Sequence, residues 1–554
     1  MDKRLSIALL LTALVVAVTP ILFPTPRRTP AADARADSIA DTISSRPVAA
    51  AQAPAAVPPS VPVVDSSVPS ADTATVPSAR PAEVITLSSQ RSTYRFSNVG
   101  AAPVAVEFSQ YRKLSPGRRG NVELAVPQAG LLSYALVVPG DTIPLVNIPF
   151  SSERSGSNGV TYRASVAGRS VAISYTLVPE RYVVKVAGRV EGGAGTSFLL
   201  VGLPPTLPAT EADTLGDLRT LAYSFKPATD NARGVPFGKL DPGEVQLERG
   251  PLTWVAVRNK YFVVGVVNPE GSSFEEMTLT GGARVSKIAT HSSAVAVKAL
   301  RDGTFAFDLY AGPQQSTELI AMGRDFDHVN PYGWSFLQPV VNPIAALCIK
   351  LLLWIHDTLA ISYGWVLIIF GVLIRIALWP LNQSAMRSSL KMQEIQPQLA
   401  EVQKKYKDKP ERQREEMMRV YKEAGASPFT ALSGCLPMLI PMPVLFALFF
   451  VFQNTIEFRG VPFMWLPDIS VKDPYYILPV LMGASMYVLS WIGLRNAPPN
   501  PQAKMMMYMF PVMMTFVLAN MASGLNLYYT AQNLAALPQQ WLLAKERMKA
   551  RQKK

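Results

Sequence analysis

One arginine, Arg375, stands inside the apolar run 361–381, and no acidic residue accompanies it there. About 20 apolar residues cross a hydrocarbon core of roughly 30 Å, and an unpaired charge in such a span is costly unless it faces water or a protein cavity. Two interpretations are open: Arg375 borders a hydrated hollow in the membrane, or it lies near the helix end and snorkels to the headgroups. In the first case it offers a fixed positive charge to an anionic or polar partner.

A second polar feature lies in the last apolar run. Polar residues recur there three to four positions apart and therefore share one helix face: Asn526, Tyr529 or Thr530, and Asn533. Polar groups in a bilayer need partners or water. We predict that this stripe and Arg375 line one cavity, with hydrogen bonding between helices as the alternative use of the asparagines.

Other kinds of chemistry have little support in the sequence. The histidines His291, His328 and His356 are scattered, and the two cysteines, Cys348 and Cys435, are far apart. We therefore expect no metal site and no disulfide framework. The sequence shows no Ser/His/Asp set, no carboxylate pair at fixed spacing and no Gly-rich phosphate loop. We predict that the protein is not an enzyme and binds no cofactor.

The composition indicates a mixed membrane and soluble architecture. The chain has 554 residues, of which 17% are charged, and its mean hydropathy is +0.17. The net charge of +13 does not predict specific DNA binding, because many Lys and Arg residues flank apolar runs as cytoplasmic membrane flanks do. Six transmembrane helices are predicted, and the last five lie at about 361–381, 436–454, 475–494, 505–521 and 524–543. This count places both termini and every basic loop on the cytoplasmic side.

The region before residue 82 is predicted to be an anchor and a linker. The first apolar run, within 1–24, ends without a small-residue cleavage site, so we expect an uncleaved transmembrane anchor; a cleaved signal peptide is the alternative. Residues 25–81 are rich in Pro, Ala and Ser and nearly free of aromatic residues. Such a segment cannot bury enough apolar surface to fold, and we predict a disordered periplasmic linker.

Residues 82–330 are predicted to form an all-β domain on the far side of the membrane from Met1. Apolar residues alternate two apart in 160–166, 171–177 and 182–186, as in half-buried strands. A β-sandwich is the expected architecture. Its aromatic residues could line a sugar cleft, but core packing is the favoured use. The following segment, 331–358, is apolar on one face and is predicted to be an amphipathic helix at the outer membrane surface.

Two basic segments are predicted on the cytoplasmic side. Helical spacing of apolar residues in 384–425, with a turn near Asp408, predicts an antiparallel helical hairpin. Basic residues outnumber acidic ones in it, although a solvated face with helix-supporting ion pairs explains most of its charges. The chain then ends in a basic tail at 544–554.

The helical part of the chain resembles the YidC/Oxa1/Alb3 family of membrane protein insertases, in its Gram-negative form. The matching stretches include YGWSFLQP from Tyr332, WPL after Arg375, KMQEIQPQL from Lys391, GCLPMLIPMPVLFALF from Gly434 and PVMMTFVLANMASGLNLYYTAQNL from Pro511. They cover nearly all of 333–540 in order and spacing. The β domain resembles the family more weakly, through WVAVRNKYF and the LYAGP end.

The resemblance implies a five-helix core at 359–543 that encloses a hydrophilic groove, together with a periplasmic supersandwich domain. Arg375 would receive hydrophilic segments of nascent membrane proteins, and Tyr529 falls at the family's substrate-contacting tyrosine. Gly371 stands where the family often has a polar residue. The resemblance also implies ribosome, Sec translocon and lipid contacts. The groove residues are Arg375, Tyr529, Asn526, Asn533 and Gly371; the hairpin residues that recruit substrate are Lys391, Lys404, Lys405, Arg412 and Arg414; the ribosome-contact residues are Lys545, Arg547, Lys549, Arg551, Lys553 and Lys554.

Two other functions compete with insertion. A secondary transporter could use Arg375 to bind an anionic solute, but such folds usually show internal repeats, and none is visible here. A tethered sugar-acting enzyme would need a carboxylate pair in the β domain, which the sequence does not offer. The expected function is therefore an insertase or chaperone in the bacterial inner membrane, working alone or with the Sec translocon.

Overall fold

The computed structural model describes residues 83–552, apart from gaps at 118, 128, 193–196, 286–287, 331–337, 381–382, 384–394, 396–397, 400, 408, 424–441 and 495–500. The predicted anchor and linker lie outside the described residues, as do parts of the predicted hairpin and of the span 436–454. All described residues belong to one compact unit, Arg80–Lys554.

The strands predicted from period-two alternation are confirmed. β8 (Gly159–Val166), β9 (Arg169–Leu177) and β10 (Val183–Glu191) follow one another as antiparallel neighbours. The residues that alternate toward the interior, such as Tyr162 and Tyr175, are fully buried. The alternation therefore arises because one face of this sheet packs on a core and the other faces solvent.

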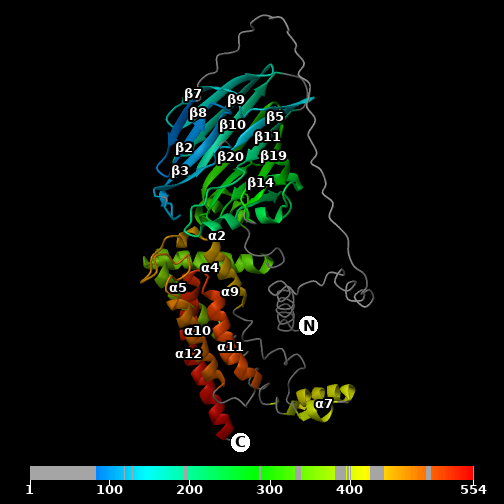
Figure 1. Ribbon diagram of the computed structural model, residues 1–554, viewed down its shortest axis with the longest axis vertical. Helices are drawn as coiled ribbons and strands as arrows, with labels where there is room; N and C mark the ends of the chain where they lie inside the picture. The colour runs from blue at the N-terminus through cyan, green and yellow to red at the C-terminus, as the bar shows by residue number, and fades with distance from the viewer. Residues whose placement is uncertain are drawn as a thin grey trace, which may run out of the picture. The chain divides into compact units, whose positions relative to one another are not determined.

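The β region contains two unequal antiparallel sheets (Figure 1). The small sheet consists of β1 (Val84–Ser88), β2 (Ser92–Ser97), β3 (Ala102–Arg112) and β4 (Asn121–Ala125), in that order. The 14-stranded sheet has the order β6-β5-β11-β19-β16-β14-β15-β20-β10-β9-β8-β7, with β12 paired to β14 and β13 to β12. Its remaining strands are β5 (Ser133–Val138), β6 (Asp141–Pro144), β7 (Ser151–Ser155), β11 (Ser197–Leu203), β12 (Ala222–Pro227), β13 (Arg233–Pro236), β14 (Val245–Arg258), β15 (Phe262–Val267), β16 (Phe274–Gly281), β19 (Ser292–Leu300) and β20 (Thr304–Pro313). A two-stranded ribbon, β17 (Arg284–Val285) and β18 (Ile288–Ala289), and the short helices α2 (Thr214–Arg219), η2 (Phe237–Lys239), α3 (Ser316–Met322) and η3 (Phe326–Val329) complete it.

Aromatic side chains join the two sheets into one hydrophobic core. The ring of Phe96 in the small sheet lies 4.8 Å from that of Tyr175 in the large sheet, and Phe108 stacks on Phe262 at 5.4 Å. The hydroxyl of Tyr94 donates a 3.1 Å hydrogen bond to the carbonyl oxygen of Ala311. These contacts make the β region a two-layer sandwich, and they give its aromatic residues the packing role that the sequence favoured.

The C-terminal region is helical (Figure 1). Its helices are α4 (Gln338–Leu359), α5 (Tyr363–Ala377), α7 (Pro410–Glu423), α9 (Met442–Asn454), the one-turn η5 (Ile456–Phe458), α10 (Ile477–Leu494), α11 (Pro501–Leu518) and α12 (Ser523–Gln552). α12 packs against both α5 and α10, and α10 packs against α11. α12 also runs through most of the predicted basic tail, because residues 544–552 are rich in strong helix formers.

Only part of the predicted membrane topology is visible as long apolar helices. Within the described residues, Val340–Leu359 in α4 is long and apolar enough to cross a bilayer, while Tyr363–Ala377, Ile477–Gly493 and Met507–Leu518 are shorter apolar helices. The count of six spans therefore stays a prediction. α4, predicted to be amphipathic, buries one face through Ala345 and Leu352 and exposes apolar Leu347 and Trp354 on another.

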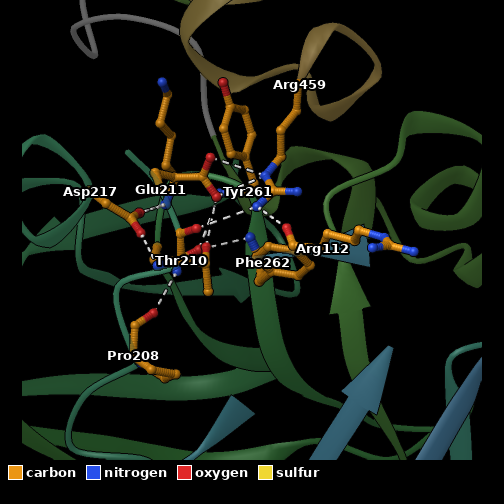
Figure 2. Close-up of polar contacts among 10 residues, drawn as sticks. Arg112, Pro208, Thr210, Glu211, Asp217, Tyr261, Phe262 and Arg459 are labelled. Atoms are coloured by element: carbon orange, nitrogen blue, oxygen red, sulfur yellow. Dashed lines mark hydrogen bonds and ion pairs between the residues drawn. The ribbon is translucent and has the colours of Figure 1, made fainter. Parts of the chain in front are cut away.

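The segment 455–476, which joins α9 to α10 and which we call the outer loop, is anchored in the β domain. Ile456 is 3% exposed and belongs to the β-domain core. Figure 2 shows Arg459 reaching Glu211: its Nε donates to both carboxylate oxygens at 2.8 and 3.0 Å, and the two side chains are only 4% and 6% exposed. Arg459 Nη2 also donates to the carbonyl oxygens of Arg112 at 2.9 Å and Thr210 at 3.4 Å.

The other side of the outer loop packs on the helices. Gly524, at the start of α12, donates its N–H to the carbonyl oxygen of Ile469 at 2.9 Å. The ring of Phe463 packs on Trp365 at 5.5 Å, against the first turn of α5. The outer loop thus contacts the β domain on one side and the first turns of α5 and α12 on the other.

Candidate functional site

The candidate site is built where α5 crosses α12, and a glycine permits their close approach. A Cβ atom at Gly371 would lie 3.1 Å from the carbonyl oxygen of Tyr528 and 3.4 Å from the Cβ of Ala531. A side chain there would need α12 to shift by a few tenths of an ångström. Gly371 therefore faces α12, one turn before Arg375.

Arg375 lies in the last turn of α5 and contacts α12 through its guanidinium. Its Nη2 donates a 2.8 Å hydrogen bond to Oε1 of Gln539. Its Nε is buried and has no hydrogen-bond partner among the described residues. Gln539 is 2% exposed, and its Nε2 donates a 3.3 Å hydrogen bond to the carbonyl oxygen of Trp379. The guanidinium thus points into the helical region, where a neutral amide holds it.

The asparagines of the predicted polar stripe on α12 form hydrogen bonds with helices other than α5. Asn533 Nδ2 donates to Oγ of Ser485 on α10 at 3.0 Å. Asn526 is fully buried; its Nδ2 donates to the carbonyl oxygen of Leu518 at the end of α11, at 3.0 Å. Gln539 lies about 140° around the helix axis from Asn526. The structure therefore gives the two asparagines contacts with other helices, and it places the partner of Arg375 on another face.

Tyr529 lies beside the arginine-facing side of α12. It is half-buried, and its ring lies 5.4 Å from that of Tyr528. Tyr528 is 1% exposed and packs on Phe370 of α5 at 5.7 Å. Tyr529 is partly exposed, whereas Tyr528 fills the space between the helices. The contact of Tyr529 with substrate stays a prediction.

Sequence reasoning missed Gln539 and Ser485. The search for polar residues at helical spacing followed the single face that begins at Asn526, and Gln539 lies outside it, immediately after Pro538. Ser485 stands alone in an apolar helix. One sequence signal could have pointed to Gln539: it is an amide side chain within a long segment that contains no charged residue.

The basic residues assigned to the hairpin and tail are described only in part. Ile395 and Leu399 pack against Tyr421 of α7, so the described portions of the hairpin share a small core. The tail residue Lys545 lies over the ring of Trp541 at 5.2 Å. The exposed hairpin residues are Lys404, Lys405, Arg412 and Arg414; Lys391, Lys553 and Lys554 and the side chains of Arg547, Lys549 and Arg551 lie outside the described parts.

Across the described ranges, no group of three His, Cys, Asp or Glu residues could hold a metal ion. The site instead consists of one cation, one neutral amide and tightly packed aromatic rings. Chemically, such an arrangement can bind and orient an anionic or carbonyl-rich segment.

Along this chain a β-sandwich is followed by a helical region that contains a half-buried arginine. Two family models match the chain: "YidC periplasmic domain" over residues 84–346 and "60Kd inner membrane protein" over residues 354–552. The first covers the β-sandwich and the beginning of α4, and the second covers the end of α4 and α5 to α12.

Relatives named membrane protein insertase YidC align with most of the chain. The relative from Chlorobaculum tepidum is 33% identical over 410 residues, which are 68% of this chain and 65% of the relative. The relatives from Chlorobium luteolum and Chlorobium phaeovibrioides are also 33% identical, over 68% and 69% of their length. The aligned part is thus about two thirds of these relatives. The chain belongs to the YidC family, which confirms the resemblance.

A crystal structure of an active YidC insertase with its first transmembrane domain resolved is also similar. It is 18% identical and covers 83% of this chain and 93% of the solved chain, with a TM-score of 0.34.

Proposed function

We propose that this protein inserts nascent proteins into the bacterial inner membrane through a hydrophilic groove that contains Arg375. The observation that carries the proposal is the half-buried side chain of Arg375 on α5, whose guanidinium has an uncharged partner on α12 at 2.8 Å, in the region that matches the inner membrane protein model. A charge in an apolar helix that has no acidic partner among the described residues is costly, so we expect it to serve a function.

The physical basis of insertion follows from this charge. Moving a short polar segment of a substrate across the hydrocarbon core is opposed by the loss of its hydration. A hydrated groove with a positive charge part-way into the bilayer lowers that cost, most of all for acidic segments. The substrate's own apolar helix then partitions into lipid and supplies the driving force, so no nucleotide hydrolysis is required.

The other predicted residues complete the proposal. Asn526 and Asn533 would support the groove by joining α12 to its neighbours, and Tyr529 would contact the substrate as it leaves. The hairpin would recruit substrates and the basic end of α12 would contact the ribosome, both from the cytoplasm, where the two termini would also lie. The β domain would lie in the periplasm, where contact with the Sec translocon is proposed.

Insertion into proteoliposomes that contain only this purified protein tests the proposal. The substrate is a small single-span protein with a short acidic outer tail. We expect insertion by the wild type, strong loss in Arg375→Ala and recovery in Arg375→Lys, because only the charge is retained in the last variant. Equal insertion by all three would remove Arg375 from the mechanism. Uptake of an anionic solute without insertion would instead favour a transporter.

A further inference from the structure

Gln539 is fixed in one orientation by the two groups that it contacts. The Trp379 carbonyl oxygen can only accept a hydrogen bond, and the Arg375 guanidinium can only donate. The amide must therefore direct its N–H toward Trp379, at 3.3 Å, and its oxygen toward Arg375, at 2.8 Å. Because both neighbours lie on or just after α5, Gln539 fixes the end of α5 and the direction of the guanidinium together.

The lack of charge on Gln539 matters as much as its position. Buried arginines are commonly paired with carboxylates, and such a pair is electrically neutral. Among the described residues, no carboxylate forms an ion pair with Arg375, although several other arginines have one, such as Arg459 with Glu211. The amide oxygen satisfies one donor of Arg375 and cancels none of its charge.

The unused donor of Arg375 indicates where a partner would bind. Its Nε is buried without a hydrogen-bond partner in the described parts of the chain. A buried donor left unmet costs free energy, and a charged donor costs more than a neutral one. An arriving carboxylate would satisfy this donor and the positive charge at once, through the charge-assisted bonds that guanidinium groups form best.

We infer that Gln539 is a positioning residue that holds Arg375 while keeping its charge available, and that it thereby sets a preference for substrates whose translocated segment carries carboxylates. This inference rests on the proposed insertase function and deepens it. A glutamate at position 539 would have nearly the same shape as the glutamine but would neutralise the arginine. The preference for acidic substrate segments therefore depends on position 539 carrying an amide side chain and not a carboxylate.

The test compares two substrates and three proteins in the proteoliposome assay. One substrate has an acidic outer tail, and the other has the same tail with each carboxylate replaced by an amide. The proteins are the wild type, Gln539→Glu and the control Gln540→Glu. Gln540 is the neighbouring residue on the face toward α10, near Gly493, so its variant adds the same charge to the same helix away from Arg375.

We expect the wild type and Gln540→Glu to prefer the acidic tail and Gln539→Glu to insert the two substrates equally. The ratio between the two substrates should fall by about tenfold in Gln539→Glu, the effect expected when one charge-assisted hydrogen bond is lost. A merely structural role would lower insertion of both substrates and leave the ratio unchanged. An unchanged ratio in Gln539→Glu, with both substrates inserted by the wild type, overturns the inference and leaves the insertase proposal intact.

Two further outcomes are decisive. If the wild type inserts neither substrate, the insertase proposal and this inference both fail. If Gln539→Glu does not reach the membrane, Gln539→Leu replaces it. Gln539→Leu leaves the charge of Arg375 in place but removes the hydrogen bond that holds its guanidinium. The ratio of insertion between the acidic and the amide substrate should then drop by at least half. A wild-type ratio in Gln539→Leu would overturn the positioning role.

Discussion

Replacing Arg459 with alanine is expected to release the outer loop from the β domain. The Arg459 and Glu211 side chains are 4% and 6% exposed, and Nε of Arg459 contacts both carboxylate oxygens within 3.0 Å. Two backbone carbonyl oxygens, of Arg112 and Thr210, accept from the same guanidinium. The substitution leaves Glu211 as a buried carboxylate whose arginine partner is gone.

The expected cost is large because the pair is buried. Removing one partner of a buried ion pair costs about 3–5 kcal/mol, whereas an exposed pair contributes about 0–1 kcal/mol. Arg163 and Glu153 provide the matched control, since they form an ion pair with side chains 57% and 69% exposed. At about 1.4 kcal/mol per factor of ten, the amides of the outer loop should exchange about 100- to 4,000-fold faster in Arg459→Ala.

Hydrogen exchange followed by mass spectrometry on peptides covering 455–476 measures this effect in the full chain, because exchange reports local opening. Arg163→Ala should leave these peptides unchanged. The double variant Glu211→Ala with Arg459→Ala should cost less than the sum of the single variants, since no buried charge is then left without its partner. Acceleration below about fivefold in Arg459→Ala would refute the reasoning, because burial would then not make this pair stronger than an exposed one.

Three further predictions concern stability. Burial raises the pKa of Asp217 from 3.8 to about 6, so the folded chain holds this proton more tightly than the unfolded chain does. The free energy of unfolding should therefore fall by roughly 3 kcal/mol at most between pH 4 and 7. In urea denaturation, Asp217→Asn should remove this dependence on pH. Burial lowers the pKa of Lys298 from 10.5 to about 8, so stability should instead rise between pH 8 and 10, and a profile for Lys298→Met that keeps this rise would contradict the assignment. A Cβ at Gly364 would lie 2.0 Å from Cδ2 of Phe463, so Gly364→Ala should cost about 1–3 kcal/mol and lower the melting temperature in detergent, with partial recovery on adding Phe463→Leu.

The sequence predicted the β-sandwich and the importance of Arg375 for clear physical reasons. Alternation with period two is a local pattern, and it needs no knowledge of which strands pair. A charge in an apolar run is equally local. Tyr162 and Tyr175 are buried where the alternation placed them, and the Arg375 guanidinium contacts another helix of the bundle. The predicted cavity beside the arginine stays a prediction.

The partners of these residues could not be predicted, because they depend on packing between distant segments. Gln539 is 164 positions from Arg375, and Glu211 is 248 positions from Arg459. Helical periodicity assigned Asn526 and Asn533 to a face, but it did not show which neighbour that face meets. The rotation of α12 between α5 and α10 decides this, and it is set by close contacts such as that of Gly371 with Tyr528.

The burial of Ile456 in the β-domain core affects how this protein can be dissected. Along the chain, the β domain looks like a separable module that ends near residue 330. In space, its core includes a residue from beyond α9, so excising 82–330 also removes the packing partners of the outer loop, which in turn contacts α5 and α12. Loss of insertion after such a deletion would report on both parts at once. A substitution at Glu211, which removes the buried ion pair with Arg459 and leaves both regions in the chain, probes the contact between them without deleting either.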